Sequence, residues 1–136
     1  MVMTRAKLVR YRHCNMESLQ SKLEQYKDCR KLVVTDVVFS MDGDIAPLPE
    51  IVDLARQYDA MVMVDDAHGS GVIGENGRGI LEHYGMTLED IDILTGTFSK
   101  ALGGPGGFVV AKKDLIDYLR ISARSFIFSS ALPEVV

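Results

Sequence analysis

The alternation of short apolar runs with segments of helical periodicity constrains the fold of this sequence more than any other feature. Strand-like runs occupy residues 7–12, 32–39, 61–64, 91–94, 108–111 and 125–129. Helix-like segments occupy residues 16–28, the stretch that carries Ile51, Leu54 and Ala55, and residues 80–84 and 114–122. Such alternation is typical of a mainly parallel sheet covered by helices, and we therefore expect a three-layer α/β fold.

One strand is expected to run against the others. Residues 95–107 form a polar, glycine-rich connection between the apolar runs at 91–94 and 108–111. A link this short cannot hold the crossover helix that joins parallel strands, so the strand at 108–111 should be antiparallel to its neighbour. At the other end of the chain, Asn15 is a suitable cap for the first expected helix.

Charge and hydropathy exclude two classes of protein. The net charge is −4 and the pI is near 5.3, whereas a protein that neutralises nucleic-acid phosphates needs a basic face. No run approaches the roughly 18 apolar residues that a membrane span requires, and residues 1–10 lack the apolar core of a secretory signal. We therefore expect a cytoplasmic protein that binds neither nucleic acid nor membrane.

Two cysteines, Cys14 and Cys29, stand apart in the sequence. They have neither a CxxC spacing nor a partnered Cys/His cluster, so they are interpreted as reduced thiols and not as a disulfide or a zinc framework. No metal site and no function are assigned to them.

Polar residues with catalytic potential follow three of the expected strands. They are Ser40, then Asp65 with His68, and then the segment Thr97–Lys100. In open parallel sheets ligands bind beyond the carboxyl ends of the strands, so these residues are expected at one edge. A single acidic residue at a strand end is commonly a cap, and a single loop lysine is commonly solvated. Here, however, Lys100 is surrounded by glycines and hydroxyl residues, which allow a cofactor to approach the backbone closely.

Four motifs in this order and spacing resemble the α-oxoamine synthase family. They are Phe39–Asp44 (FSMDGD), Val64–Gly69 (VDDAHG), Gly74–Gly79 (GENGRG) and Gly96–Ala101 (GTFSKA). That family includes 8-amino-7-oxononanoate synthase, glycine C-acetyltransferase, 5-aminolevulinate synthase and serine palmitoyltransferase. The resemblance covers nearly the whole chain and implies the large domain of fold-type-I enzymes that use pyridoxal 5'-phosphate (PLP). It also implies a homodimer with its sites at the subunit interface.

The resemblance implies catalytic roles for three residues. Lys100 corresponds to the lysine that forms the Schiff base with PLP and later moves the proton of the amino acid's Cα. Asp65 corresponds to the carboxylate that binds the pyridinium nitrogen, which improves the ring as an electron sink. His68 corresponds to the histidine near the cofactor's phenolic oxygen, where it orients the ring and polarises the incoming carbonyl.

Five further residues match cofactor-binding positions of the family. Ser40 corresponds to a serine that contacts the phenolic oxygen, and Thr97 to a hydroxyl on the phosphate side, to which Ser99 adds a contact. Ser129 and Ser130 stand where the family has a hydroxyl pair that reaches the phosphate of the partner subunit.

The implied reaction is the decarboxylating condensation of a small amino acid with an acyl-CoA, giving an α-aminoketone. Among family members, 8-amino-7-oxononanoate synthase of biotin biosynthesis and glycine C-acetyltransferase fit equally well. Residues 1–136 are expected to be a partial PLP-binding large domain that lacks the amino-terminal arm and the carboxyl-terminal small domain of the family. The isolated chain is therefore expected to have little or no synthase activity, because several strands and apolar faces would lack their partners.

Three other readings remain open. A receiver domain would need an acceptor aspartate beyond a strand, whereas Asp92 stands at the start of one. A divalent-cation hydrolase would use oxygen and nitrogen ligands such as Asp42, Asp44, Asp65, Asp66 and His68, but it leaves Lys100 unexplained. A non-catalytic remnant that serves as an interaction or dimerisation module would keep every one of these motifs.

Overall fold

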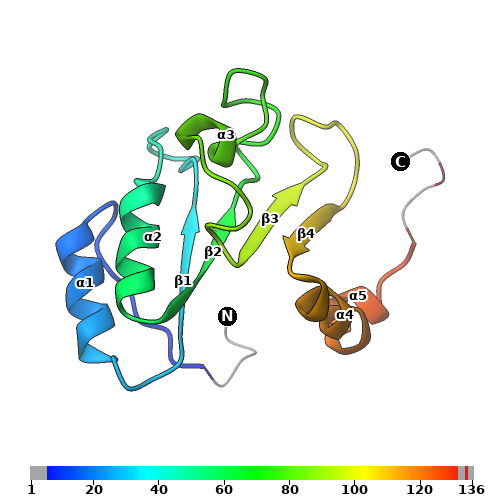
Figure 1. Cartoon of the computed structure of the whole chain (residues 1–136). Coiled ribbons are helices and arrows are strands. Elements are labelled where there is room, and N and C mark those ends of the chain that lie inside the picture. Colours follow the sequence, from blue (N-terminus) through cyan, green and yellow to red (C-terminus); the bar gives the residue numbers. More distant parts are fainter. Residues whose placement is uncertain (1–5, 132–133, 135–136) are drawn as a thin grey trace.

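A four-stranded sheet forms the centre of the computed structural model, which describes residues 6–131 and residue 134 (Figure 1). Its strands are β1 (Lys31–Asp36), β2 (Ala60–Asp65), β3 (Ile93–Thr97) and β4 (Gly107–Ala111), in the order β1-β2-β3-β4. The first three strands are parallel, and β4 is antiparallel to β3. The prediction of a mainly parallel α/β sheet with one antiparallel strand is thus confirmed.

Five helices accompany the sheet in the described part of the chain. They are α1 (Met16–Gln25), α2 (Leu48–Gln57), α3 (Ile80–Tyr84), α4 (Lys113–Ser122) and α5 (Arg124–Ile127). Asn15 caps α1 as expected, because its side chain accepts a hydrogen bond from the backbone N–H of Ser18 at 2.7 Å. None of these helices is long and apolar enough to cross a bilayer.

The hydrophobic core lies on one face of the sheet. Val33, Val62, Val64 and Leu94 alternate onto this face and are buried. Helix α2 packs against β2 with α1 beside it (Figure 1). On the opposite face the apolar side chains stay partly open: Leu32, Met61 and Val109 are 49%, 45% and 44% exposed.

Two expected strands are absent. Residues 7–12 form no strand; Arg12 instead donates its backbone N–H to Ser18 Oγ at 3.1 Å, and the Lys7 amine lies 4.6 Å from the centre of the Tyr26 ring. Residues 125–129 were also predicted wrongly, since α5 occupies most of them. The backbone N–H groups of Phe126 and Ile127 both donate to the carbonyl of Ala123, so this apolar run is satisfied locally and pairs with no strand.

Other elements differ only at their ends. The first helix stops at Gln25 and not at residue 28, and β1 stops at Asp36 and not at residue 39. Strand β3 is displaced toward Thr97 relative to the expected 91–94. The side chain of Asp92 accepts a hydrogen bond from the backbone N–H of Val62 at 2.8 Å. Asp92 therefore lies in the turn before β3, and the strand begins only at Ile93.

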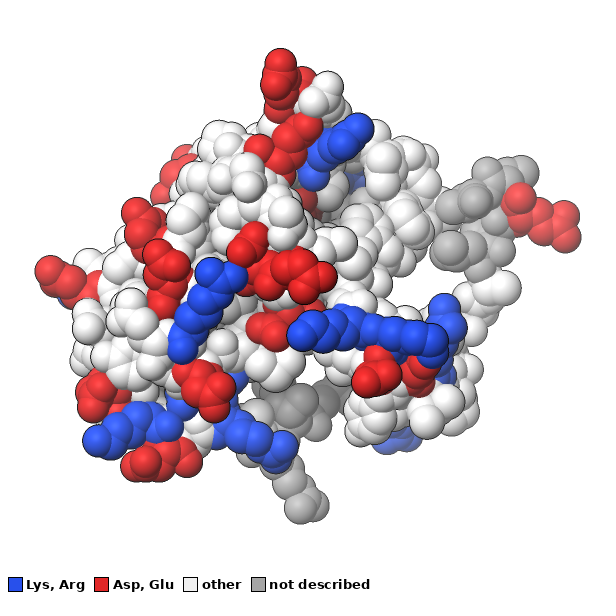
Figure 2. Space-filling model, in the orientation of Figure 1, with Lys and Arg blue, Asp and Glu red and all other residues white. Residues whose placement is uncertain are grey.

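The charged side chains are mixed on the face drawn in Figure 2, where acidic and basic groups lie next to one another. Arg56, for example, pairs with Asp90 at 2.8 Å, and both side chains are at least partly exposed. Exposed ion pairs of this kind contribute about 1 kcal/mol or less to the free energy of folding. The sheet is therefore stabilised mainly by its apolar core and not by these pairs.

Candidate active site

Asp65 ends β2 at the edge where the parallel strands finish. The register aligns it with Asp36 of β1 and Thr95 of β3, so these three side chains point to the same face of the sheet. That face is the one opposite the buried Val62 and Val64. The Asp65 carboxylate is half-buried and accepts the backbone N–H of Ala67 at 3.0 Å through Oδ1.

His68 and Lys100 come together although 32 residues separate them. Lys100 Nζ lies 2.7 Å from His68 Nε2. The loops that carry them are in close contact, because a Cβ added to Gly71 would lie 2.7 Å from the Cβ of Ala101. The positive φ of 81° at Gly71 also suits glycine alone among common residues. The glycine-rich loop thus brings an imidazole to the amine of Lys100.

Thr97 and Ser99 form a hydroxyl pair at the end of β3. Their side-chain oxygens lie 2.7 Å apart, and Thr97 Oγ1 also contacts the carbonyl of Gly106 at 3.1 Å. The backbone N–H of Ser99 donates back to Thr97 Oγ1 at 3.2 Å. Together these contacts fix two hydroxyls immediately before Lys100.

Three of the predicted residues are not drawn into these contacts. Ser40 is exposed in the turn after β1. Ser129 Oγ donates only to the carbonyl of Ser130 at 3.4 Å, and both serines are exposed. Among the described residues no hydrogen bond joins any of the three to His68, Thr97 or Lys100, and their roles stay predictions.

Asp66 is the structural centre that sequence reasoning missed. It is 1% exposed, and its Oδ2 accepts hydrogen bonds from Ser70 Oγ at 3.0 Å and the backbone N–H of Ile80 at 3.4 Å. Burial raises the pKa of this carboxyl above its ordinary value. One signal in the sequence indicated a buried Asp66. This aspartate is followed by the glycines Gly69 and Gly79, which have no Cβ and so leave room for its side chain.

We expect the stability of the protein to depend on pH through Asp66. The pKa of Asp66 is raised in the folded state, whereas the unfolded chain has the ordinary aspartate pKa of about 3.9. At a pH between these two pKa values, the folded protein therefore binds a proton at Asp66 and the unfolded chain does not. Stability from this group therefore rises as pH falls through that window. Relative to Asp66→Asn, the wild-type free energy of unfolding should increase from neutral pH toward pH ~4.

Urea denaturation of both proteins over that pH range checks this expectation. Glu82 and Asp90 shift stability the other way, since hydrogen bonds from Asn76 and Thr87 lower their pKa values. They titrate in both proteins, so their effect cancels in the difference. A difference that does not change with pH would contradict the assignment to Asp66.

The rival readings lose support in the geometry. Within residues 6–131 and 134, the only group of three or more His, Cys, Asp or Glu ligand atoms lying within 4.8 Å of one another is His13, Cys14 and Asp44, so the hydrolase-type cation site is not assembled. Asp92 lies at the start of β3 and not beyond a strand end, which disfavours a receiver domain.

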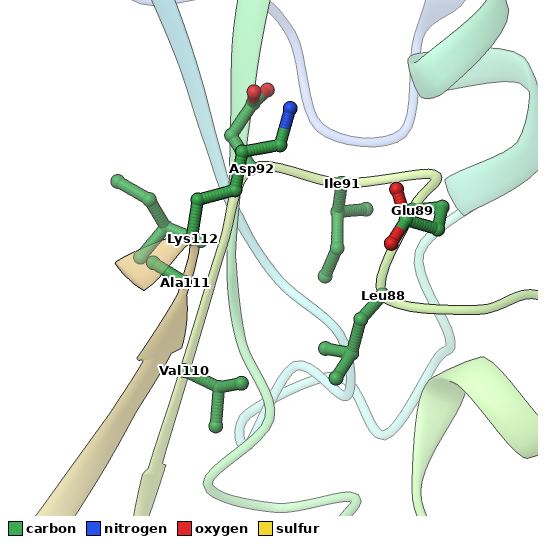
Figure 3. Close-up of a pocket in the computed structure, with 8 residues that line it drawn as sticks. Leu88, Glu89, Ile91, Asp92, Val110, Ala111 and Lys112 are labelled. Atoms are coloured by element: carbon green, nitrogen blue, oxygen red, sulfur yellow. The ribbon is translucent and has the colours of Figure 1, made fainter. Parts of the chain in front are cut away.

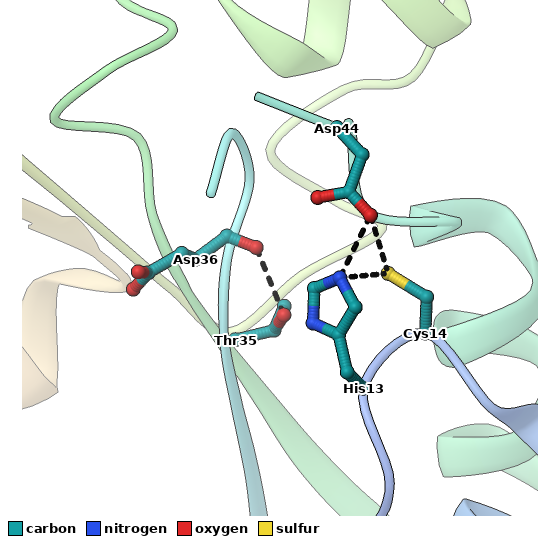
Figure 4. A network of polar contacts seen from close by, with 5 residues as sticks. All are labelled: His13, Cys14, Thr35, Asp36 and Asp44. Carbon is teal, nitrogen blue, oxygen red and sulfur yellow. Dashed lines mark hydrogen bonds and ion pairs between the residues drawn. The ribbon is translucent and has the colours of Figure 1, made fainter. Parts of the chain in front are cut away.

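Cys14 has a partner that the sequence interpretation did not foresee. Cys14 and Cys29 are free thiols, as expected. The absence of a Cys/His cluster was wrong, however, because Cys14 Sγ lies 3.5 Å from His13 Nε2 (Figure 4). Burial, followed by the nearby Asp44, raises the pKa of this thiol.

Two cavities lie away from the candidate site. One of about 200 Å³ is lined by Leu88, Ile91, Asp92, Val110 and Lys112, among others (Figure 3). A second, of about 300 Å³, shares Ile91, Asp92 and Lys112 with it. Both are at the end of the sheet where β3 begins, opposite to Asp65 and Lys100. At the other end of the sheet, Lys100 is exposed and Asp65 and His68 are partly exposed.

Comparison with known proteins places these residues in a family. The 8-amino-7-oxononanoate synthase of Petrotoga mobilis is 58% identical over 133 residues, which are 96% of this chain and 34% of that protein. The structure of serine palmitoyltransferase from Sphingomonas wittichii matches with a TM-score of 0.87 and 43% identity, over 94% of this chain and 32% of that one. A serine palmitoyltransferase variant of S. paucimobilis with a bound PLP-myriocin aldimine matches with a TM-score of 0.87 and 45% identity, over 94% and 33% of the two chains.

These relatives confirm the resemblance to the α-oxoamine synthases that the four motifs predicted. The chain spans about a third of the length of the curated relatives it matches. A family model described as aminotransferase class I and II matches residues 2–136, so this chain belongs to the aminotransferase class I and II family.

Proposed function

We propose that this chain supplies the lysine-bearing part of a PLP-dependent enzyme that condenses an amino acid with an acyl-CoA. The observation that carries the proposal is the 2.7 Å contact between Lys100 Nζ and His68 Nε2 at the sheet edge where Asp65 also lies. The relatives named above support the same activity.

The residues at this edge fit PLP by their chemistry. Lys100 is an exposed primary amine, which suits covalent attachment to an aldehyde. Asp65 is a half-buried carboxylate with one oxygen engaged by Ala67, and its other oxygen suits a protonated ring nitrogen. Thr97 and Ser99 present hydroxyls that suit a phosphate.

The chain's own groups would divide the reaction between them. Bound PLP supplies an electron sink for a carbanion at the amino acid's Cα. Lys100 Nζ removes the Cα proton, and His68 Nε2, in contact with that amine, takes part in its proton exchange and orients the acyl carbonyl. A carbon–carbon bond would then form between Cα and the thioester carbon while CoA leaves as its thiolate, which takes a proton from solvent. The amino acid's carboxylate would leave as carbon dioxide, and Lys100 Nζ would return a proton to Cα in its place.

The setting of this activity is also part of the proposal. Residues 1–136 would belong to a PLP-binding large domain, working in a cytoplasmic homodimer with a small amino acid and an acyl-CoA as substrates. Ser40 would contact the phenolic oxygen, and Ser129 and Ser130 would reach the phosphate held by the partner subunit. The partly open apolar side chains Leu32, Met61 and Val109 support further protein packing against that face of the sheet.

PLP titration tests the cofactor assignment, and Asp65→Asn is its sharpest variant. We expect the visible absorption of lysine-bound PLP on titration, with an apparent Kd raised by about 10- to 100-fold in Asp65→Asn. The estimate follows from about 1.5–3 kcal/mol for a hydrogen bond to a charged group. The matched control is Asp36→Asn, which removes the same charge from the same face of the neighbouring strand.

Two outcomes would contradict the proposal. Equal weakening by Asp36→Asn and Asp65→Asn would assign the effect to the general charge of the sheet edge and not to a ring contact. Absence of any visible band with wild-type protein would remove PLP from the site and favour the non-catalytic interaction module. Because residues 1–136 alone are expected to have little or no synthase activity, release of CoA thiol by the PLP-loaded protein at the rates of full-length relatives would overturn that expectation.

A further inference from the structure

Three donor atoms converge outside the candidate active site. His13 Nε2 lies 2.7 Å from Asp44 Oδ2 and 3.5 Å from Cys14 Sγ, and Cys14 Sγ lies 3.8 Å from Asp44 Oδ2. Two segments that are 30 residues apart supply them: the turn before α1 and the loop after β1. Figure 4 shows the three side chains pointing at one another. Imidazole nitrogen, thiolate sulfur and carboxylate oxygen are the ligand types that Zn²⁺ prefers.

The arrangement does not match a Cys–His–Asp catalytic relay. In a Cys–His–Asp relay the histidine uses one ring nitrogen for the thiol and the other for the carboxylate. Here the same nitrogen, His13 Nε2, faces both groups. In addition, the thiol contacts the carboxylate directly. The atoms therefore form a triangle around one point, which is the geometry of chelation and not of a proton relay.

The size of the triangle matches a tetrahedral zinc site on two of its sides. Metal–ligand bonds of about 2.0–2.3 Å at tetrahedral angles place the ligand atoms roughly 3.4–3.6 Å apart. The distances from Cys14 Sγ, 3.5 and 3.8 Å, are close to that range. The 2.7 Å His13–Asp44 hydrogen bond has to open by roughly 0.7 Å to reach it. Both side chains are about half exposed, at 46% and 45%, so they have room to do so.

Charge and backbone conformation favour a cation at this point. Asp44 places a carboxylate oxygen 3.8 Å from the Cys14 sulfur, so a cation bound between them would have a negative charge beside it. Cys14 also has a positive φ of 47°, a conformation that residues other than Gly, Asn and Asp rarely adopt. In this backbone conformation the Cys14 thiol points toward His13 and Asp44.

We propose that His13, Cys14 and Asp44 form a binding site for Zn²⁺ with an open fourth position. The metal would tie the loop after β1 to the start of α1. The His13 ring already packs edge-on against Phe39, with ring centres 4.3 Å apart, and Phe39 precedes Ser40. The site is separate from the proposed PLP chemistry and does not depend on it.

Metal titration of the untagged protein tests the site. Zn²⁺ competition against a chromogenic chelator should give one equivalent per chain, and Co²⁺ should produce a thiolate-to-cobalt charge-transfer band. Cys14→Asn should abolish that band and weaken Zn²⁺ binding by more than about tenfold, because even residues behind the ligands cost roughly 10- to 100-fold. Asparagine tolerates positive φ, so this variant is expected to keep the fold, which circular dichroism checks.

Two matched variants complete the experiment. Cys29→Ser removes the other free thiol and should leave the cobalt band unchanged, whereas Asp44→Asn should weaken binding as Cys14→Asn does. The proposal is overturned if wild-type protein binds no Zn²⁺ at millimolar metal. It is equally overturned if Cys14→Asn binds as tightly as wild type, or if the cobalt band follows Cys29.

Discussion

Replacing Lys100 with alanine is expected to abolish covalent attachment of PLP to this protein. An aldehyde needs an uncharged primary amine, and Lys100 is the amine that contacts His68 at the edge where Asp65 ends its strand. Reduction of the PLP-loaded protein with borohydride, followed by peptide mass spectrometry, should find the adduct on Lys100 in wild type. In Lys100→Ala no adduct should form and the visible band should be absent, while PLP can still bind without a covalent bond.

Lys112 offers the matched control for this experiment. It is an exposed lysine that follows β4 and lines the cavities at the opposite end of the sheet (Figure 3). Lys112→Ala should therefore keep the band and the adduct at wild-type levels. Persistence of both signals in Lys100→Ala, or their loss in Lys112→Ala, would contradict the role of Lys100 and with it the proposed function. Neither result would bear on the zinc site, which shares no residue with these measurements.

Local patterns were enough to predict the four strands of the sheet in order and the sheet edge at which Asp65, His68 and Lys100 lie. Apolar runs and turn residues mark β2 and β3, and the short link after β3 determines that β4 is antiparallel. Asp65, His68 and Lys100 were expected at one edge because each lies at a strand end or within three residues after one, and the structure has them there. The contact between His68 and Lys100 was not predictable in detail, since it depends on how closely Gly71 approaches Ala101.

Features that depend on distant partners were missed. The run Ser125–Ser129 has a strand pattern, but a strand also needs a neighbour, and the local bonds of α5 replaced it. His13 and Cys14 are adjacent in sequence, yet their third partner, Asp44, arrives only through the folding of the loop after β1. Asp66 was considered only as a possible cation ligand, whereas the chain from Gly69 to Gly79 closes over it.

Gly79 lies in the loop that covers Asp66. Gly79→Ala is expected to lower the free energy of unfolding by about 3–5 kcal/mol. Gly79 has φ 83° and ψ −160°, a region that is essentially restricted to glycine and costs other residues about 1–3 kcal/mol. The added Cβ would also lie 2.0 Å from Asp66 Oδ2, a buried atom that cannot move into solvent. Urea denaturation measures the change in the free energy of unfolding.

Gly85→Ala is a control for backbone strain at a glycine with positive φ. Gly85 has φ 64° and ψ 26° at the end of α3, and an added Cβ there meets nothing within 4 Å. Only backbone strain remains, so this control should cost about 1–2 kcal/mol. If Gly79→Ala costs no more than Gly85→Ala, the contact with Asp66 does not constrain the loop.

A double variant then tests whether the excess belongs to Asp66. In Asp66→Ala the carboxylate that the new Cβ would strike is gone, so adding Gly79→Ala on that background should cost only the backbone strain. The two substitutions should therefore be non-additive, with the double variant more stable than the sum of the single effects predicts. Additive costs would mean that the loop from Gly69 to Gly79 relaxes away from Asp66. In that case the close contact of Gly71 with Ala101, and hence of His68 with Lys100, would not rest on this buried carboxylate.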